Sequence, residues 1–127
     1  MSFDWSEYLN LANELGGKPG DPVNREARLR SAVSRAYYAA HCIVRNYLRD
    51  LKGDANIPKD GRAHSYVIDQ FRFEKENSRK RIGLNLGRLL VDRNKADYRD
   101  TVSGIEPMTQ ADLSLAQQII RWISSLK

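Results

Sequence analysis

The stretch of sequence that decides the fold runs from Glu26 to Leu51, EARLRSAVSRAYYAAHCIVRNYLRDL. It contains neither glycine nor proline, and residues with high helix propensity dominate it. Its apolar residues follow one another at steps of three or four, the spacing of one face of an α-helix: Leu29, Val33, Ala36, Ala40, Ile43, Tyr47 and Leu51. At about 100° per residue, this set falls within a band roughly 80° wide. We therefore expect one long helix with a core-facing side.

The opposite face of the same helix is polar and carries residue types that serve in chemistry. It holds Arg35, Tyr38, His41, Cys42, Arg45 and Arg49. Histidine titrates near neutral pH, and the planar fork of arginine matches phosphate oxygens. We therefore expect any function of this helix to lie on that face.

Length and composition predict a single soluble domain that spans residues 1–127. A hydrophobic content of 41% beside 29% charged residues is typical of globular proteins. Cys42 is the only cysteine, so no disulfide can form within the chain, which fits a reducing compartment. The chain has no apolar run of about 20 residues, and its first ten residues, MSFDWSEYLN, lack the features of a secretory signal. We expect a cytoplasmic protein without a membrane segment.

Turn and capping residues divide the rest of the chain into four further helices. Loops are expected at 18–23, 53–61 and 101–107, where glycine and proline gather, and Asn24 is the expected N-cap of the long helix. No segment alternates as a β-strand would, so the predicted fold is all-α, a five-helix bundle of the up-and-down type. The expected boundaries are Asp4 or Ser6 to about Leu15, Arg62 to Phe73, Glu74 to Tyr98, and a last helix that begins at Thr109.

Two local patterns make sharper structural predictions. Gly83 and Gly87 lie four residues apart in the fourth helix, where each costs about 1 kcal/mol relative to alanine. Close approach of another backbone is the usual compensation, so we expect a packing site there. Thr109 as N-cap, with Asp112 three residues on, approximates a capping box at the start of the last helix.

The net charge of +5 is concentrated in one segment. Arg72 to Arg99 contains nine lysines and arginines against four acidic residues, while the rest of the chain is balanced. Such a stripe suits an anionic partner such as RNA or DNA, but it also suits a solvated helix face.

Arg35 and His41 are the candidates for catalysis. Cleavage of RNA without a metal needs a base for the 2′-hydroxyl proton and a cation for the phosphate, roles that fit His41 and Arg35. Their spacing separates them by about 9 Å along a helix and some 120° around it, so they could line one cleft, which a two-fold dimer could complete. The alternative to a catalytic pair is that His41 is an ordinary histidine at the boundary of the core and that Arg35 is a surface or ion-paired residue. Cys42, His41 and His64 do not form a zinc-ligand spacing, and we expect neither a metal nor another cofactor.

Three stretches resemble the HEPN domain family. They are Ser34 to His41, SRAYYAAH, with the preceding 28–32; Arg93 to Tyr98, RNKADY, with Leu89 and Leu90 before it; and Trp5 to Leu15. The resemblance implies a helical bundle that commonly dimerises, in small prokaryotic proteins of toxin–antitoxin or related defence systems, often beside a minimal nucleotidyltransferase. It also implies, for catalytic members, a metal-independent endoribonuclease with an Arg-x4–6-His motif at a dimer cleft.

Arg35 and His41 satisfy that spacing, with five residues between them. The chain departs from the active pattern at Ala36, where a polar residue usually follows the arginine, and no histidine follows Arg93.

The sequence leaves three functional hypotheses. The first is a dimeric RNA-directed protein, an endoribonuclease in its catalytic form, with Arg35 and His41 catalytic and with Tyr38, Arg45 and Arg93 binding RNA. The second is a non-catalytic module that binds a partner protein, such as a nucleotidyltransferase, or a nucleotide. The third is a plain helical dimer with no ligand.

Overall fold

Five α-helices make up the computed structural model, which describes residues 2–17 and 23–126 and has no β-strand among them. This confirms the predicted all-α bundle of five helices. The predicted loop at 18–23 lies, apart from Val23, outside the described residues. A π-helical turn, Tyr47–Leu51, follows the second helix directly. The helices are α1 (Ser6–Gly16), α2 (Arg25–Asn46), α3 (Ala63–Arg72), α4 (Asn77–Tyr98) and α5 (Ile105–Ser125).

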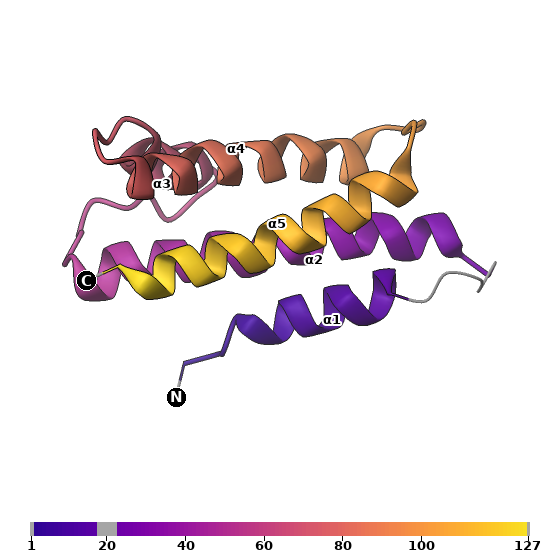
Figure 1. Ribbon diagram of the computed structural model, residues 1–127, viewed down its shortest axis with the longest axis horizontal. Helices are drawn as coiled ribbons and strands as arrows, with labels where there is room; N and C mark the ends of the chain where they lie inside the picture. The colour runs from indigo at the N-terminus through magenta and orange to yellow at the C-terminus, as the bar shows by residue number, and fades with distance from the viewer. Residues whose placement is uncertain (1, 18–22, 127) are drawn as a thin grey trace.

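The four longer helices lie along the long axis of the molecule and alternate in direction along the chain (Figure 1). Helix α2 is the centre of the bundle because it packs against α1, α3, α4 and α5. The short helix α3 packs mainly against α4. No helix in the described ranges combines the length and the apolar character that crossing a membrane requires.

Helix α2 is buried on more sides than its apolar stripe predicts. Four alanines with no exposed surface let the neighbouring helices approach it closely: Ala32, Ala36, Ala39 and Ala40. The predicted polar face is wrong at His41 and Cys42, which are both buried, and the predicted core face is wrong at Leu51, which is exposed. The reason is that an amphipathic stripe predicts one partner face, whereas α2 has four helical partners.

The helix starts agree with the predictions at one end of the chain and differ at the other. Asp4 stands before α1 and accepts hydrogen bonds from the amide and the hydroxyl of Ser6 at 3.0 and 2.6 Å. Helix α5 starts at Ile105, four residues before the predicted cap, and Thr109 is a buried residue within it. The Thr109 hydroxyl donates to the Ile105 carbonyl at 2.7 Å, so the predicted capping box is wrong. Pro107 is tolerated because amides in the first helical turn need no intrahelical partner.

Only one of the two glycines in α4 is a packing site. A β-carbon added to Gly83 would lie 2.2 Å from the backbone nitrogen of Arg72, at the end of α3. A β-carbon on Gly87 would meet its nearest neighbour, the Ile68 side chain, at an ordinary 3.8 Å. The prediction of close backbone approach is therefore confirmed at Gly83 and wrong at Gly87.

A buried carboxyl group lies between α4 and α5. Asp112 is only 3% exposed, and its Oδ2 atom has no hydrogen-bond partner among the described residues. Burial, followed by the hydrogen bond to Asp92 and the charge of that residue, raises the pKa of Asp112 to about 8. Arg88 and Lys95 on α4 oppose this rise. The carboxyl group is therefore protonated at neutral pH.

Candidate functional site

Two of the three stretches that carry the sequence resemblance, SRAYYAAH with the preceding 28–32 and RNKADY, meet in the folded chain, and Arg30 fixes their alignment. Its guanidinium donates to the carbonyl oxygens of Ala96, Arg99 and Asp100, at 3.1, 2.5 and 3.1 Å. These carbonyls lie at and just beyond the end of α4, where an α-helix leaves carbonyl groups without partners. Arg30 thus ties the first half of α2 to the last turn of α4.

The residues brought together beside this contact form an arginine–tyrosine cluster, which we define as Tyr8, Arg35, Tyr38 and Arg93. Arg93 donates to the Tyr38 hydroxyl at 2.7 Å, and its guanidinium carbon lies 5.0 Å from the centre of the Tyr38 ring. The guanidinium carbon of Arg35 lies 5.5 Å from the same ring and 4.9 Å from the Tyr8 ring. Three helices, α1, α2 and α4, therefore build one cationic and aromatic surface.

One carboxylate, that of Asp97, neutralises one of the cluster's two arginines. Arg93 forms an ion pair with Asp97 at 2.8 Å, one helical turn further along α4. Asp97 also accepts from the Ser34 hydroxyl at 3.3 Å. Arg35 forms no ion pair within the described part of the chain, and its only hydrogen bond there is a long one of 3.5 Å to Ser34. The charge of Arg35 is therefore available to an anion.

Arg45 lies further along α2, in a different setting. Its guanidinium binds the side-chain oxygen of Asn46 at 3.0 and 3.2 Å and lies 5.5 Å from the centre of the Trp5 ring. No carboxylate pairs with it among the described residues. Arg45 also borders a pocket of about 470 Å³ that includes Arg49 and Lys59. The positive surface of α2 thus extends beyond the cluster.

His41 lies inside the protein rather than on this surface. It is 4% exposed, its ring centre lies 4.6 Å from that of His64 on α3, and it stacks on Tyr37 at 5.5 Å. Its Nδ1 atom is buried and has no hydrogen-bond partner in the described residues. No hydrogen bond or ring contact joins His41 to Arg35 there. The structure therefore does not bring the two predicted catalytic residues together.

Burial also sets the charge of His41. Desolvation, then the nearby His64 and the charges of Arg45 and Arg93, lowers the pKa of His41 to about 3. The imidazole is neutral at pH 7, and a proton on it would have no water to stabilise it. This environment suits a packed side chain better than a group that exchanges protons with a substrate.

His64 is the histidine that sequence reasoning missed. It is half-buried, and its Nδ1 atom lies 2.5 Å from the Tyr37 hydroxyl. Burial, with a smaller contribution from Arg93, lowers the pKa of His64. Burial raises the pKa of Tyr37, so its hydroxyl keeps its proton. A proton-transfer group in this region would therefore be His64 rather than His41.

Few sequence signals point to the other residues of the site. Arg30, Tyr8 and Asp97 belong to the site because of contacts between helices. Of the three, only Asp97 is part of the RNKADY stretch. Within the described residues, no group of three or more histidine, cysteine, aspartate or glutamate side chains is placed to hold a metal ion. Burial raises the pKa of the Cys42 thiol, which makes it a poor nucleophile.

Comparison with models of protein families, with curated proteins and with solved structures finds no match in any of the three.

Proposed function

We propose that this chain is a HEPN-like module that binds single-stranded RNA through the arginine–tyrosine cluster. The observation that carries the proposal is the meeting of the SRAYYAAH and RNKADY stretches at the bond between Tyr38 and Arg93. Of the five predicted site residues, Arg35 and Arg93 both lie against the ring of a third, Tyr38.

The chemistry of the surface supports a nucleic-acid ligand. Proteins that bind single strands combine cations for the backbone with aromatic or guanidinium planes on which bases stack. Arg35 offers a cation without a carboxylate partner in the described residues. Tyr98 lies 5.6 Å from the Arg93 guanidinium and is 71% exposed, so its ring can receive a base. Arg45 and Trp5 provide a second pair of the same kind.

Binding without cleavage fits the interior position of His41. In the proposal, Arg35 contacts phosphate, Tyr38 and Arg93 hold the strand, and His41 packs the centre of the bundle. A metal-independent endoribonuclease is the second candidate, favoured by the Tyr37–His64 pair between α2 and α3. The homodimer and the nucleotidyltransferase-type partner rest on the sequence resemblance alone.

The test is the affinity of the purified protein for a fluorescently labelled single-stranded RNA, measured by anisotropy at several salt concentrations. We expect Arg35→Ala to weaken binding about tenfold and to reduce the salt slope by about 0.7, the change for one phosphate contact on a single strand. Arg62→Ala is the matched control, because Arg62 is exposed and paired with Asp60 at 2.8 Å outside the cluster. Equal affinity of the Arg35 variant and the wild-type protein would refute the proposal.

Incubation of the same RNA with protein and excess EDTA separates binding from cleavage. The proposal predicts intact RNA. Cleavage that His64→Ala abolishes and His41→Leu preserves would establish the second candidate, with His64 as its acid or base. Cleavage lost in an Arg35→Ala/His41→Ala double variant but kept in His64→Ala would support the catalytic roles predicted for Arg35 and His41 from their spacing.

A further inference from the structure

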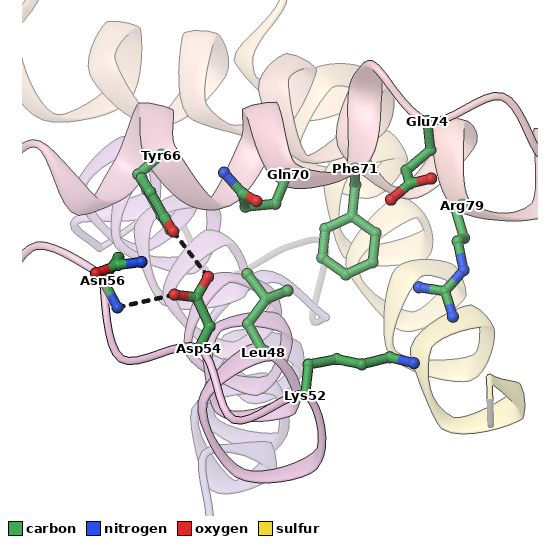
Figure 2. Close-up of a pocket in the computed structure, with 9 residues that line it drawn as sticks. All are labelled: Leu48, Lys52, Asp54, Asn56, Tyr66, Gln70, Phe71, Glu74 and Arg79. Carbon is green, nitrogen blue, oxygen red and sulfur yellow. Dashed lines mark hydrogen bonds between the residues drawn. The ribbon is translucent and has the colours of Figure 1, made fainter.

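A pocket of about 550 Å³ lies on a different part of the molecule from the arginine–tyrosine cluster and shares no residue with it. It is formed by the π-helical turn after α2, the loop that follows, α3 and the first turn of α4 (Figure 2). Its volume is in the range of sites for small molecules. The lining residues are Leu48, Lys52, Asp54, Asn56, Tyr66, Gln70, Phe71, Glu74 and Arg79.

One end of the pocket is cationic. The Lys52 ammonium and the Arg79 guanidinium both lie against the Tyr47 ring, at 5.9 and 6.0 Å from its centre, and Figure 2 shows the two side chains approaching each other. The Arg79 side chain is only 19% exposed. Its partners are the Tyr47 hydroxyl at 3.2 Å and Glu76, whose carboxylate is 4.0 Å away.

Those partners compensate the charge of Arg79 poorly. A largely buried guanidinium is costly unless a close anion accompanies it, and a phenol carries no charge. Lys52 forms no ion pair among the described residues. A phosphate group placed between the two would supply the missing charge and accept hydrogen bonds from both side chains.

The other end of the pocket is polar and fixed in place. The Asp54 carboxylate accepts from the Tyr66 hydroxyl and from the backbone N–H of Asn56, each at 2.8 Å. Figure 2 shows the Asn56 and Gln70 side-chain amides at this end of the pocket. Amide groups beside an ordered carboxylate are suited to hydroxyl groups, which both donate and accept hydrogen bonds.

The floor of the pocket offers little apolar surface. Phe71 and Leu48 form it, and both are buried, at 1% and 7% exposure. A ligand that depends on stacking or on an apolar contact would gain little here. The backbone beside the pocket is the π-helical turn Tyr47–Leu51, a rare conformation that often accompanies functional sites.

We propose that this pocket binds a sugar phosphate, with the phosphate between Lys52 and Arg79 and the sugar hydroxyls toward Asn56, Gln70 and Asp54. Two sources share this chemistry: a free metabolite and the phosphorylated 5′ end of an RNA strand. Glu74 lines the pocket near its cationic end, and its negative charge opposes the phosphate.

The experiment titrates the full chain with ribose 5-phosphate and follows heat or amide chemical shifts. Saturable binding with a dissociation constant below about 1 mM is expected, with ribose and inorganic phosphate each at least about tenfold weaker. Lys52→Ala and Arg79→Ala should each weaken binding about tenfold, and Glu74→Gln should strengthen it about threefold. Lys52 and Glu74 are exposed, so their variants report on binding even if Arg79→Ala destabilises the fold.

Lys75→Ala is the matched control, because Lys75 is exposed and next to Glu74 but does not line the pocket. An equal loss in this control, inorganic phosphate binding as tightly as ribose 5-phosphate, or no saturable binding would overturn the assignment. Competition by RNA with a 5′-phosphate, but not with a 5′-hydroxyl, would identify the strand end as the source. Absence of that competition would identify the free metabolite. The Arg35 variant distinguishes this site from the cluster, because it should leave ribose 5-phosphate binding unchanged.

Discussion

Arg35 and His41 lie six residues apart on the same helix, yet the fold gives them opposite environments. Arg35 is partly exposed and lies among aromatic rings, without a carboxylate partner in the described residues. His41 is buried, and α3 covers it with the ring of His64. A spacing along α2 fixes the angle between two side chains, but it cannot show which other helix covers one of them. The comparison separates a residue that can bind an anion from one that packs the core.

The largest expected effect comes from disturbing the cover over His41. Gly83 lets the end of α3 approach α4, and a methyl group there would lie 2.2 Å from the Arg72 nitrogen. We expect Gly83→Ala to lower the free energy of unfolding by about 3 kcal/mol, since backbone atoms must move to admit the methyl group. Urea denaturation measures this loss, and hydrogen exchange should show faster opening of α3 than of α2.

Gly87→Ala is the control for that change, in the same helix and with the same chemistry. Its added methyl group has room, so the variant should be as stable as the wild-type protein or up to about 1 kcal/mol more stable. An equal change in stability in the two variants would contradict the backbone contact at Gly83, because helix propensity alone favours alanine at both positions.

A second prediction tests the neutral state of His41 through the pH dependence of stability. The pKa of His41 is about 3 in the folded protein against 6.5 for the free side chain, so below pH 6.5 the unfolded chain binds a proton that the folded chain does not. Stability is therefore full above pH 6.5 and falls as the pH drops toward 3. Between pH 6.5 and about 5, the loss should be about 2 kcal/mol.

His41→Leu supplies the comparison, because leucine fills similar space and does not titrate. The difference in unfolding free energy between this variant and the wild-type protein should change by about 2 kcal/mol between pH 6.5 and about 5. A constant difference would show that His41 reaches solvent, and the catalytic role predicted from the spacing would then regain support.

The sequence predicted the helices well because their signals are local. Apolar spacing, glycines and prolines located all five helices, and the cost of glycine in a helix pointed correctly to Gly83. The errors occur where tertiary contacts override local chemistry. Thr109 has a capping side chain, but helix α5 starts earlier and buries it. Of the candidate site, Arg35, Tyr38 and Arg93 were predictable as residue types, whereas His64 and Arg30 required the packing of α3 and α4 to be known.

The smallest expected effect extends the comparison to the other side of the bundle. If exclusion of charge from the interior is what separates His41 from Arg35, Asp112 should show the opposite pH dependence. Its pKa is about 8 in the folded protein against 3.8 for the free side chain, so the folded chain holds a proton that the unfolded chain has lost. The free-energy cost of keeping the Asp112 carboxyl protonated in the fold is absent below pH 3.8 and grows as the pH rises toward 8.

Asp112→Asn keeps the shape, cannot ionise and can donate to Asp92 at every pH. We expect the variant to gain about 1 kcal/mol relative to the wild-type protein between about pH 5 and pH 6, as measured by urea denaturation. Below pH 6.5, His41 and Asp112 change the free energy of unfolding with pH in opposite directions. The two contributions partly cancel, so measurements on the wild-type protein alone would reveal neither. A stability difference for Asp112→Asn that stays flat over this interval would show the carboxylate to be ionised in the fold, with Arg88 and Lys95 outweighing burial and Asp92.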